Sequence, residues 1–236
     1  MTTRILAFSF LLLVPGTISL GQPKEQPQNK LIQFHMAIIR KGPNWSAEKT
    51  EETQKIREQH VGYAMSLLSS GKLVAAGPFS DDAGILGIFI FRATNAEEAK
   101  SWADADPAVK AGLHMNEMHP WWSQDVFGKA ATPMKLETVY FGFLKRGPNR
   151  KEGDAKTPEV QELQKAHIAN INRLAETKKL VVAGPFGDDG DFRGIFVFRV
   201  GSLKEAEELA ATDPMIKIDR LRLELHPWNV PNGIIP

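Results

Sequence analysis

The chain has 236 residues, with 29 Lys and Arg against 28 Asp and Glu, so its formal net charge is +1. This balance excludes the strongly basic surface by which proteins bind nucleic acids or anionic membranes. Cysteine is absent, which excludes disulfide bonds, thiolate metal sites and a cysteine nucleophile.

The first segment, residues 1–21, has the pattern of a secretory signal peptide. Arg4 supplies a positive charge, an apolar run follows over residues 5–14, and Ser19 and Gly21 are the small residues of a cleavage site. The apolar run is too short for a membrane span, which needs about 20 residues. We therefore expect a secreted or periplasmic protein without membrane association after cleavage, and a polar tail over residues 22–30.

Alternating apolar residues predict a first strand at about residues 32–38. A helix is predicted next, over residues 47–70, because apolar residues and one histidine recur at the spacing of a single helix face. This stripe consists of Ile56, His60, Tyr63 and Leu67. Gly71 is placed to end the helix as a left-handed cap.

Two apolar strands are predicted at about residues 72–79 and 86–93. A second helix is expected to begin near residue 95, with Asn95 as its N-cap. An Asp-Pro pair at residue 106 then predicts a short helical turn. The last strand is expected to end at a His-Pro-Trp sequence that starts at residue 119.

The same order of elements returns in the second half of the chain, displaced by 107 residues. Between residues 72–92 and 179–199, 14 of 21 positions are identical. Before the first helix the displacement is 105 residues, so the second copy has gained two residues within 150–159. Lys178 replaces Gly71, and we therefore expect that the left-handed cap is not kept in the second copy.

The repeated β-α-β-β-α-β order predicts an α+β protein with two ferredoxin-like domains, at residues 31–128 and 137–236, joined by a linker at 129–136. We expect the first and fourth strands of each domain at the sheet edges. Helices cover only one face of such a sheet. The free faces are therefore expected to pack against each other, as an intrachain dimeric α+β barrel, or pseudo-dimer.

The first candidate catalytic residues are His60 and His167, which occupy the same helix position in both copies. An imidazole in an apolar pocket can move protons near neutral pH. The alternative is a core histidine whose ring nitrogens bond to the backbone. Asp106 and Asp213 also have two interpretations, as the N-cap of a short helix or as a carboxylate that orients the histidine.

Other polar residues are expected to have minor roles. No metal site is predicted, and the acidic residues between strands are interpreted as turn residues. These residues are Asp81, Asp82, Asp188 and Asp189. His119 and His226, in the two His-Pro-Trp sequences, are expected to be structural or to lie at a pocket rim. His114 has Leu221 as its counterpart, which argues against a role common to both halves.

Together these motifs resemble the YCII (YciI-like) family, in which a helical histidine precedes a Gly-Pro strand, an acidic loop and an Asp-Pro pair. The first copy carries His60, Gly77-Pro78, Asp81-Asp82, Gly87 and Asp106-Pro107. The second copy carries His167, Gly184-Pro185, Asp188-Asp189, Gly194 and Asp213-Pro214. The chain departs from the usual pattern because it is tandem and carries an export signal.

The resemblance implies ferredoxin-like domains that pair through their sheets, and a His–Asp pair at an active site. The family is similar to muconolactone isomerases and includes a dehydrochlorinase. The sequence thus predicts an exported protein that binds a small cyclic or aromatic molecule, with His60 and His167 as general acid/base and Asp106 and Asp213 as orienting partners. Lyase or isomerase chemistry without a cofactor is expected. The alternative is a non-catalytic binding or structural module outside the cytoplasm, and a further homo-oligomer is left open.

Overall fold

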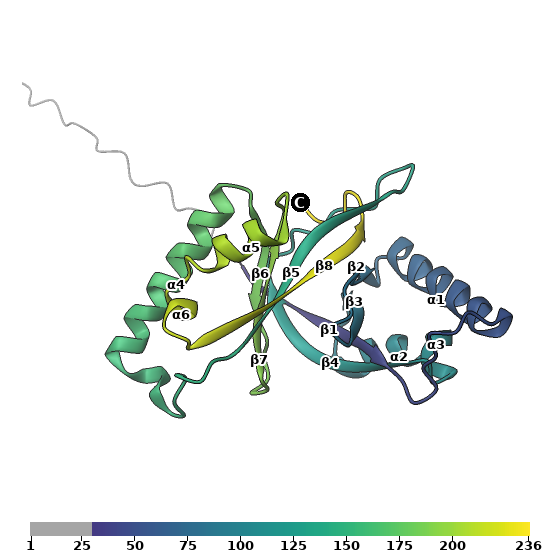
Figure 1. Ribbon diagram of the computed structural model, residues 1–236, viewed down its shortest axis with the longest axis horizontal. Coiled ribbons are helices and arrows are strands. Elements are labelled where there is room, and N and C mark those ends of the chain that lie inside the picture. The colour runs from purple at the N-terminus through teal and green to yellow at the C-terminus, as the bar shows by residue number, and fades with distance from the viewer. Residues whose placement is uncertain (1–29) are drawn as a thin grey trace, which may run out of the picture.

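The computed structural model describes residues 30–236, and the predicted signal peptide lies outside this range. The described chain forms two similar halves, each with one sheet (Figure 1). The first half contains β1 (Ile32–Lys41), α1 (Glu51–Ser69), β2 (Leu73–Pro78), β3 (Ile85–Phe91), α2 (Ala96–Asp104), α3 (Pro107–Lys110) and β4 (His114–Ser123). The second half contains β5 (Leu136–Arg146), η1 (Asp154–Lys156), α4 (Pro158–Glu176), β6 (Leu180–Pro185), β7 (Phe192–Phe198), α5 (Leu203–Ala210), α6 (Pro214–Lys217) and β8 (Leu221–Pro231).

Both sheets have four strands, in the orders β2-β3-β1-β4 and β6-β7-β5-β8. The expectation that the first strand lies at a sheet edge is wrong, because β1 and β5 are central. The connection from β1 to β2 crosses β3, and the connection from β3 to β4 crosses β1. The strands β1 and β3 are therefore neighbours in the centre of the sheet, between β2 and β4. All the pairings within the sheets are antiparallel.

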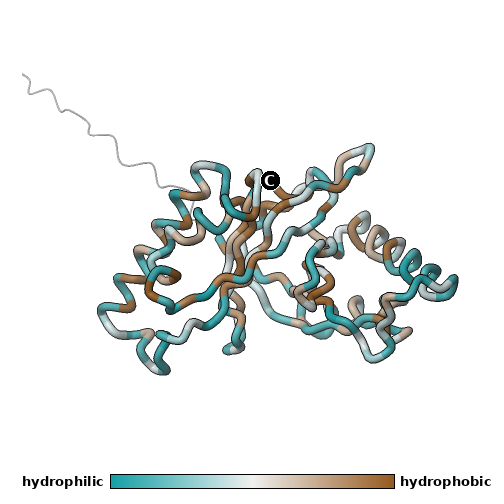
Figure 2. Tube along the Cα trace, in the orientation of Figure 1, coloured by the Kyte–Doolittle hydropathy of each residue, from teal (hydrophilic) through white to brown (hydrophobic). Residues whose placement is uncertain are grey.

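The main hydrophobic core lies between the two sheets and draws buried residues from both halves. Figure 2 shows hydrophobic residues along the strands where the halves meet. The expected intrachain dimeric α+β barrel is therefore confirmed. Its two seams, between β2 and β8 and between β4 and β6, are marked by isolated bridges from Phe79 to Trp228 and from Trp121 to Phe186.

Two buried tryptophans form hydrogen bonds across the seams between the halves. Trp228 Nε1 donates to the carbonyl of Gly77 at 2.9 Å, and Trp121 Nε1 donates to the carbonyl of Gly184 at 3.2 Å. Both indole rings are fully buried. The Gly-Pro and His-Pro-Trp sequences, which are far apart along the chain, therefore meet where one half contacts the other.

The helices cover the outer face of each sheet (Figure 1), over a separate smaller core in each half. Buried alanines, such as Ala99 in α2 and Ala206 in α5, allow these helices to approach the sheet closely. None of the helices within residues 30–236 combines the length and the apolar character needed to cross a membrane. Asn95 and Ser202 cap α2 and α5 by accepting bonds from Glu98 N and Glu205 N, as the sequence predicted for Asn95.

The left-handed helix cap is present in both halves. Gly71 has a φ of 75°, as expected, and Lys178 has a φ of 59°. The expectation that the second cap is lost is therefore wrong. The chain keeps the backbone conformation and places a residue with a Cβ atom in it, which for L-residues costs roughly 1–2 kcal/mol.

Lys178→Gly is expected to raise the free energy of unfolding by about 1 kcal/mol, because it removes the Cβ atom that disfavours this conformation. Gly71→Ala is the matched control and is expected to lower the free energy of unfolding by a similar amount. No atom lies within 4 Å of the added Cβ, so only the backbone conformation contributes to this change. Denaturant unfolding of both variants measures these changes. A destabilised Lys178→Gly variant would contradict the account.

Candidate functional site

Each half brings its helical histidine and its Asp-Pro aspartate together. In the first half, His60 Nδ1 on α1 lies 2.6 Å from Asp106 Oδ2. In the second half, His167 Nδ1 on α4 lies 2.6 Å from Asp213 Oδ2. Both distances are within hydrogen-bond reach. The pairs therefore form in space, and their use in catalysis remains a proposal.

Each aspartate both caps a short helix and contacts its histidine, because the two oxygens of the carboxylate have different partners. Asp213 Oδ1 accepts from Met215 N at 2.9 Å and thereby caps α6. Asp106 Oδ1 accepts from Ala108 N at 2.8 Å in the same way. Both aspartates are almost fully buried. The helix cap therefore fixes the carboxylate, and the second oxygen is left for the histidine.

The imidazole rings lie parallel to a phenylalanine of the sheet. His60 stacks on Phe89 with ring centroids 5.6 Å apart, and His167 stacks on Phe196 at 6.1 Å. The aspartate occupies Nδ1 in each case, so Nε2 is the nitrogen left for a ligand. Stacking and the hydrogen bond together hold each ring in one orientation.

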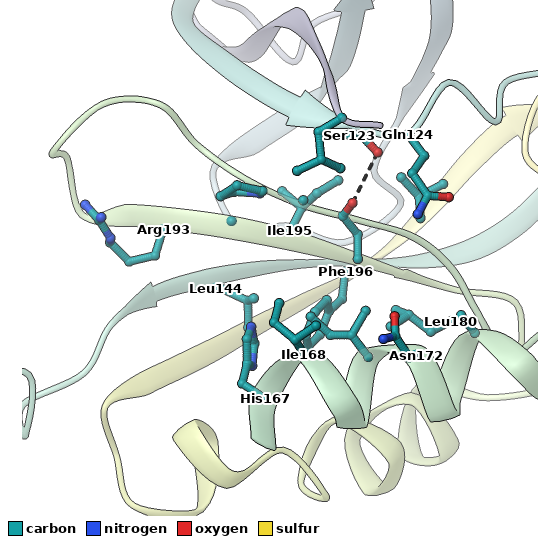
Figure 3. Close-up of a pocket in the computed structure, with 18 of the residues that line it drawn as sticks. Ser123, Gln124, Leu144, His167, Ile168, Asn172, Leu180, Arg193, Ile195 and Phe196 are labelled. Carbon is teal, nitrogen blue, oxygen red and sulfur yellow. Dashed lines mark hydrogen bonds between the residues drawn. The ribbon is translucent and has the colours of Figure 1, made fainter. Parts of the chain in front are cut away.

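A cavity of about 690 Å³ borders His167 (Figure 3). Its walls come from α4 and the second sheet, and part of the chain around the end of β4 also contributes. Most lining residues are apolar. The polar ones are Ser123, Gln124, Arg150, Gln164, His167, Asn172 and Arg193. Among the described residues that line this cavity there is no carboxylate.

In the first half, aromatic rings surround the equivalent histidine. The ring of His114 meets His60 edge-on, with centroids 4.8 Å apart. Trp45 stacks on His114 with ring centroids 5.9 Å apart, and the Arg57 guanidinium lies 5.8 Å from the Trp45 ring. The second half has Arg150 and Leu221 in place of Trp45 and His114. The two sites have therefore diverged around a common His–Asp pair.

The pKa of His114 is lowered to about 4, chiefly by burial and also by the neighbouring His60 and Arg57 charges, against the opposing effect of Asp106. The unfolded chain has a His pKa near 6.5 and therefore binds this proton more readily between pH 6.5 and 4. The stability contribution of the neutral ring is complete above pH 6.5 and is lost as the pH falls to 4.

His114→Leu, which introduces the residue of the second half, is expected to reduce the loss of stability between pH 7 and pH 4.5 by about 2 kcal/mol, after allowance for partial solvent exposure. Urea unfolding of both proteins at each pH measures this difference. At pH 7 the ring is neutral in both states, so the comparison there isolates packing. Equal pH dependence of the two proteins would refute the assignment.

Two further His–Asp pairs cross between the halves. His119 Nδ1 of β4 lies 2.6 Å from Asp188 Oδ2, and His226 Nδ1 of β8 lies 2.8 Å from Asp81 Oδ2. The sequence had assigned these aspartates to turns alone, which is incomplete. Each turn reaches across the seam because β2 and β6 lie beside β8 and β4 of the other half. His226 is 1% exposed, so this contact belongs to the buried interface.

Asp188→Asn is expected to lower the free energy of unfolding by about 1–3 kcal/mol, because it replaces a charge-assisted bond to a largely buried imidazole. Asp189→Asn is the matched control, since the Asp189 side chain is fully exposed. Chemical denaturation of the two variants in parallel measures the difference. Equal stability of the two variants would show that the crossed pair contributes nothing.

Sequence reasoning missed Arg150 and Arg193 in the cavity wall. The His–Asp pairs were found because both copies contain them, whereas each of these arginines occurs only in the second copy. Arg150 stands where the first copy has Trp45, and Arg193 stands where it has Leu86. Differences between the copies at positions around the shared histidine were the available signal. Within residues 30–236 no group of three His, Asp or Glu side chains is arranged to hold a metal ion.

Fold and site together define a class: a single-chain α+β barrel of two ferredoxin-like halves, each with a His–Asp pair that joins its long helix to the start of a short one. The YCII-related domain model matches twice, at residues 33–121 and 147–229. The chain therefore belongs to the YCII-related domain family, as a tandem duplication.

Individual relatives agree with this assignment. The chain is 34% identical over 76 residues to Protein YciI of Escherichia coli O6:H1, which covers 29% of this chain and 78% of that protein. Protein YciI of Shigella flexneri gives the same values.

Solved structures share the whole two-half architecture. A mutant chlorite dismutase from Candidatus Nitrospira defluvii has a TM-score of 0.56 at 12% identity, over 84% of this chain and 91% of that chain. A heme-binding protein from Thermus thermophilus has a TM-score of 0.52 at 10% identity, over 84% and 92%. At this level of identity the likeness concerns the fold alone.

Proposed function

We propose that this protein is an exported YCII-related protein that binds a small cyclic or aromatic molecule and catalyses a proton transfer of the lyase or isomerase type. The observation that carries the proposal is His167, which lies in the wall of the largely apolar cavity and is paired with the buried Asp213. The cavity volume of about 690 Å³ suits a small ring compound. No cofactor is needed for this chemistry.

His167 would act as general acid/base through Nε2. The ring accepts a proton from a substrate carbon or hydroxyl, and Asp213 stabilises the imidazolium through the Nδ1 hydrogen bond. The same proton then returns to another substrate atom in an isomerisation, or to the leaving group in an elimination. The apolar walls exclude water and so protect the intermediate anion from adventitious protonation.

Solvent deuterium exchange into a panel of cyclic lactones and substituted hydroquinones tests this proposal. We expect His167-dependent exchange or turnover, which His167→Ala abolishes and Asp213→Asn lowers by roughly 10²–10⁴-fold. His60→Ala reports whether the first half contributes. Unchanged turnover in the His60→Ala/His167→Ala double variant would show that the pairs are structural. Saturable binding without exchange would instead support the alternative of a non-catalytic binding module.

Export is part of this proposal and rests on the sequence of residues 1–21 alone. Mass spectrometry of the native protein is expected to find an N-terminus near Gln22. An intact Met1 or Thr2 on protein recovered from the cytoplasm would remove the claim.

Heme binding is a second candidate, because the Thermus thermophilus protein of this fold is described as heme-binding. The residues fit in one respect: His167 presents Nε2 at a large cavity and has a carboxylate on Nδ1, which is the arrangement of many iron-ligating histidines. Titration with hemin is expected to give a Soret shift that His167→Ala removes if this candidate is correct. Non-saturable hemin uptake that is equal in both proteins would eliminate it.

A further inference from the structure

We propose that the second-half cavity selects ligands with a carboxylate group, bound by Arg150 and Arg193, and that the first half has lost this specificity. This inference rests on the proposed function, because it assigns a substrate class to the same site. It concerns two residues that are not part of the His–Asp pair and that differ between the two copies.

Neither guanidinium forms a hydrogen bond with a carboxylate among residues 30–236. Arg150 forms no ion pair there, and it is half-buried. The nearest carboxylate to Arg193 is that of Asp189, at 3.8 Å, and Asp189 is fully exposed. Arg193 Nη1 donates to the backbone oxygens of Asp188 and Gly190 at 3.3 and 3.4 Å, whereas Nε is buried without a hydrogen-bond partner. Both side chains therefore retain donors for a planar anion, which arginine binds in a bidentate manner.

A third arginine in the same region, Arg220, does have a carboxylate partner, although its Nε, like that of Arg193, is buried without a hydrogen bond. Arg220 is 5% exposed and binds Asp154 in a bidentate pair, with Nη2 2.8 Å from Oδ1. Asp154 lies in η1, within the stretch that is two residues longer in the second copy. Burial, followed by the charges of Arg193, Arg220 and Arg146, lowers the pKa of Arg150, and the charge of Asp154 opposes this only in part. The cavity wall is therefore short of negative charge, which a bound carboxylate would supply.

The charged and catalytic groups lie on different walls of one cavity. Figure 3 shows Arg193 extending from the sheet and His167 from helix α4, with the apolar side chains of Leu144 and Ile168 near His167. A ligand with an apolar ring and a carboxylate fits this combination. The ring contacts the apolar wall, the carboxylate binds the arginines, and the orientation relative to His167 is fixed.

The first half lacks these features. Trp45 and Leu86 stand in place of Arg150 and Arg193, and Trp45 packs against His114 beside His60. Neither residue can bind an anion through a charge. The one arginine near Trp45 is Arg57, whose Nη2 donates to the carbonyl of Ser46 at 2.7 Å. A carboxylate ligand is therefore expected to bind more tightly at His167 than at His60.

Binding of benzoate and of its neutral analogue benzamide to the full chain tests the inference. A Kd on the order of 1 mM is expected for benzoate, as for fragments of this size, and binding of benzamide should be at least about tenfold weaker. Arg150→Gln and Arg193→Gln should each weaken benzoate binding about tenfold and leave benzamide unaffected. Arg193→Lys should retain more affinity than Arg193→Gln. Arg222→Gln is the control, because it removes the same charge from an exposed position.

The site of binding is read from the imidazole NMR signals, assigned with the His60→Ala and His167→Ala variants. Benzoate should shift the signals of His167 and leave those of His60 in place. Four outcomes would each overturn the inference. They are equal affinity for benzoate and benzamide, benzoate binding at His60, arginine variants that bind benzoate as tightly as the parent protein, and the lack of saturable benzoate binding. The proposed function and this inference can fail separately. Proton transfer on neutral substrates alone would support the proposed function and contradict the carboxylate specificity. Arginine-dependent benzoate binding without any proton exchange would support the specificity and contradict the proposed function.

Discussion

Gly77→Ala is expected to lower the free energy of unfolding by more than about 3 kcal/mol. A Cβ atom at this position would lie 1.9 Å from the backbone oxygen of Asn229 and 3.1 Å from Trp228 Nε1. The obstructing atom belongs to the backbone of the other half, so no side-chain rotation relieves the overlap. The seam would have to open and lose the bond from Trp228 to Gly77.

The second copy and a helical glycine provide the controls for this prediction. Gly184→Ala should behave like Gly77→Ala, because its Cβ would lie 1.9 Å from the oxygen of Trp122. Gly62→Ala adds the same methyl group in the middle of α1, where no atom lies within 4 Å, and should stabilise the protein by about 0.5–1 kcal/mol. Urea unfolding compares the three variants. If Gly77→Ala were tolerated as well as Gly62→Ala, the described contact between the halves would be wrong.

Asp213→Ala is expected to lower the free energy of unfolding by about 3 kcal/mol. The loss of the α6 N-cap accounts for about 1 kcal/mol. The rest arises because the His167 ring, which is 8% exposed, loses its hydrogen-bond partner. Asp213→Asn keeps the oxygen that accepts from Met215 N and should recover the capping part.

A double-mutant cycle with His167→Ala separates the two contributions of Asp213. The coupling free energy between Asp213→Ala and His167→Ala should equal the destabilisation by Asp213→Ala that exceeds the loss of the helix cap. The reason is that the cap remains in place when the histidine is removed. The same cycle with Asp106 and His60 is the comparison, in a pair whose imidazole is more exposed. Additive effects of the two substitutions would mean that the His–Asp bond contributes nothing to stability.

The architecture was predictable because the chain repeats itself. Alternating apolar residues gave the strands, and Asn95 and the Asp-Pro pairs gave the helix starts. The position of β1 in the centre of its sheet was not predictable from these local patterns. It depends on how the helical connections pass over neighbouring strands, which concerns tertiary packing. Lys178 also escaped prediction, because the tertiary fold requires a left-handed residue where local preference opposes one.

The site was predictable in part. His60, His167 and their aspartates stood out because both copies kept them, although their distances depended on the fold. The crossed pairs of Asp81 and Asp188 depend on contacts between residues far apart along the chain. No local pattern distinguishes such a residue from an ordinary turn aspartate. The same holds for Arg193, whose neighbours come from several elements.

Residues 124–135, which connect β4 to β5, hold the two halves in one molecule. A barrel built from two separate domains would dissociate on dilution, so its melting temperature would rise with protein concentration. In this chain each half faces its partner at a fixed effective concentration set by that short connection. The melting temperature should therefore be the same in dilute and in concentrated solution. A protein released outside the cell, where no pool of free subunits is maintained, would keep its complete barrel at any dilution.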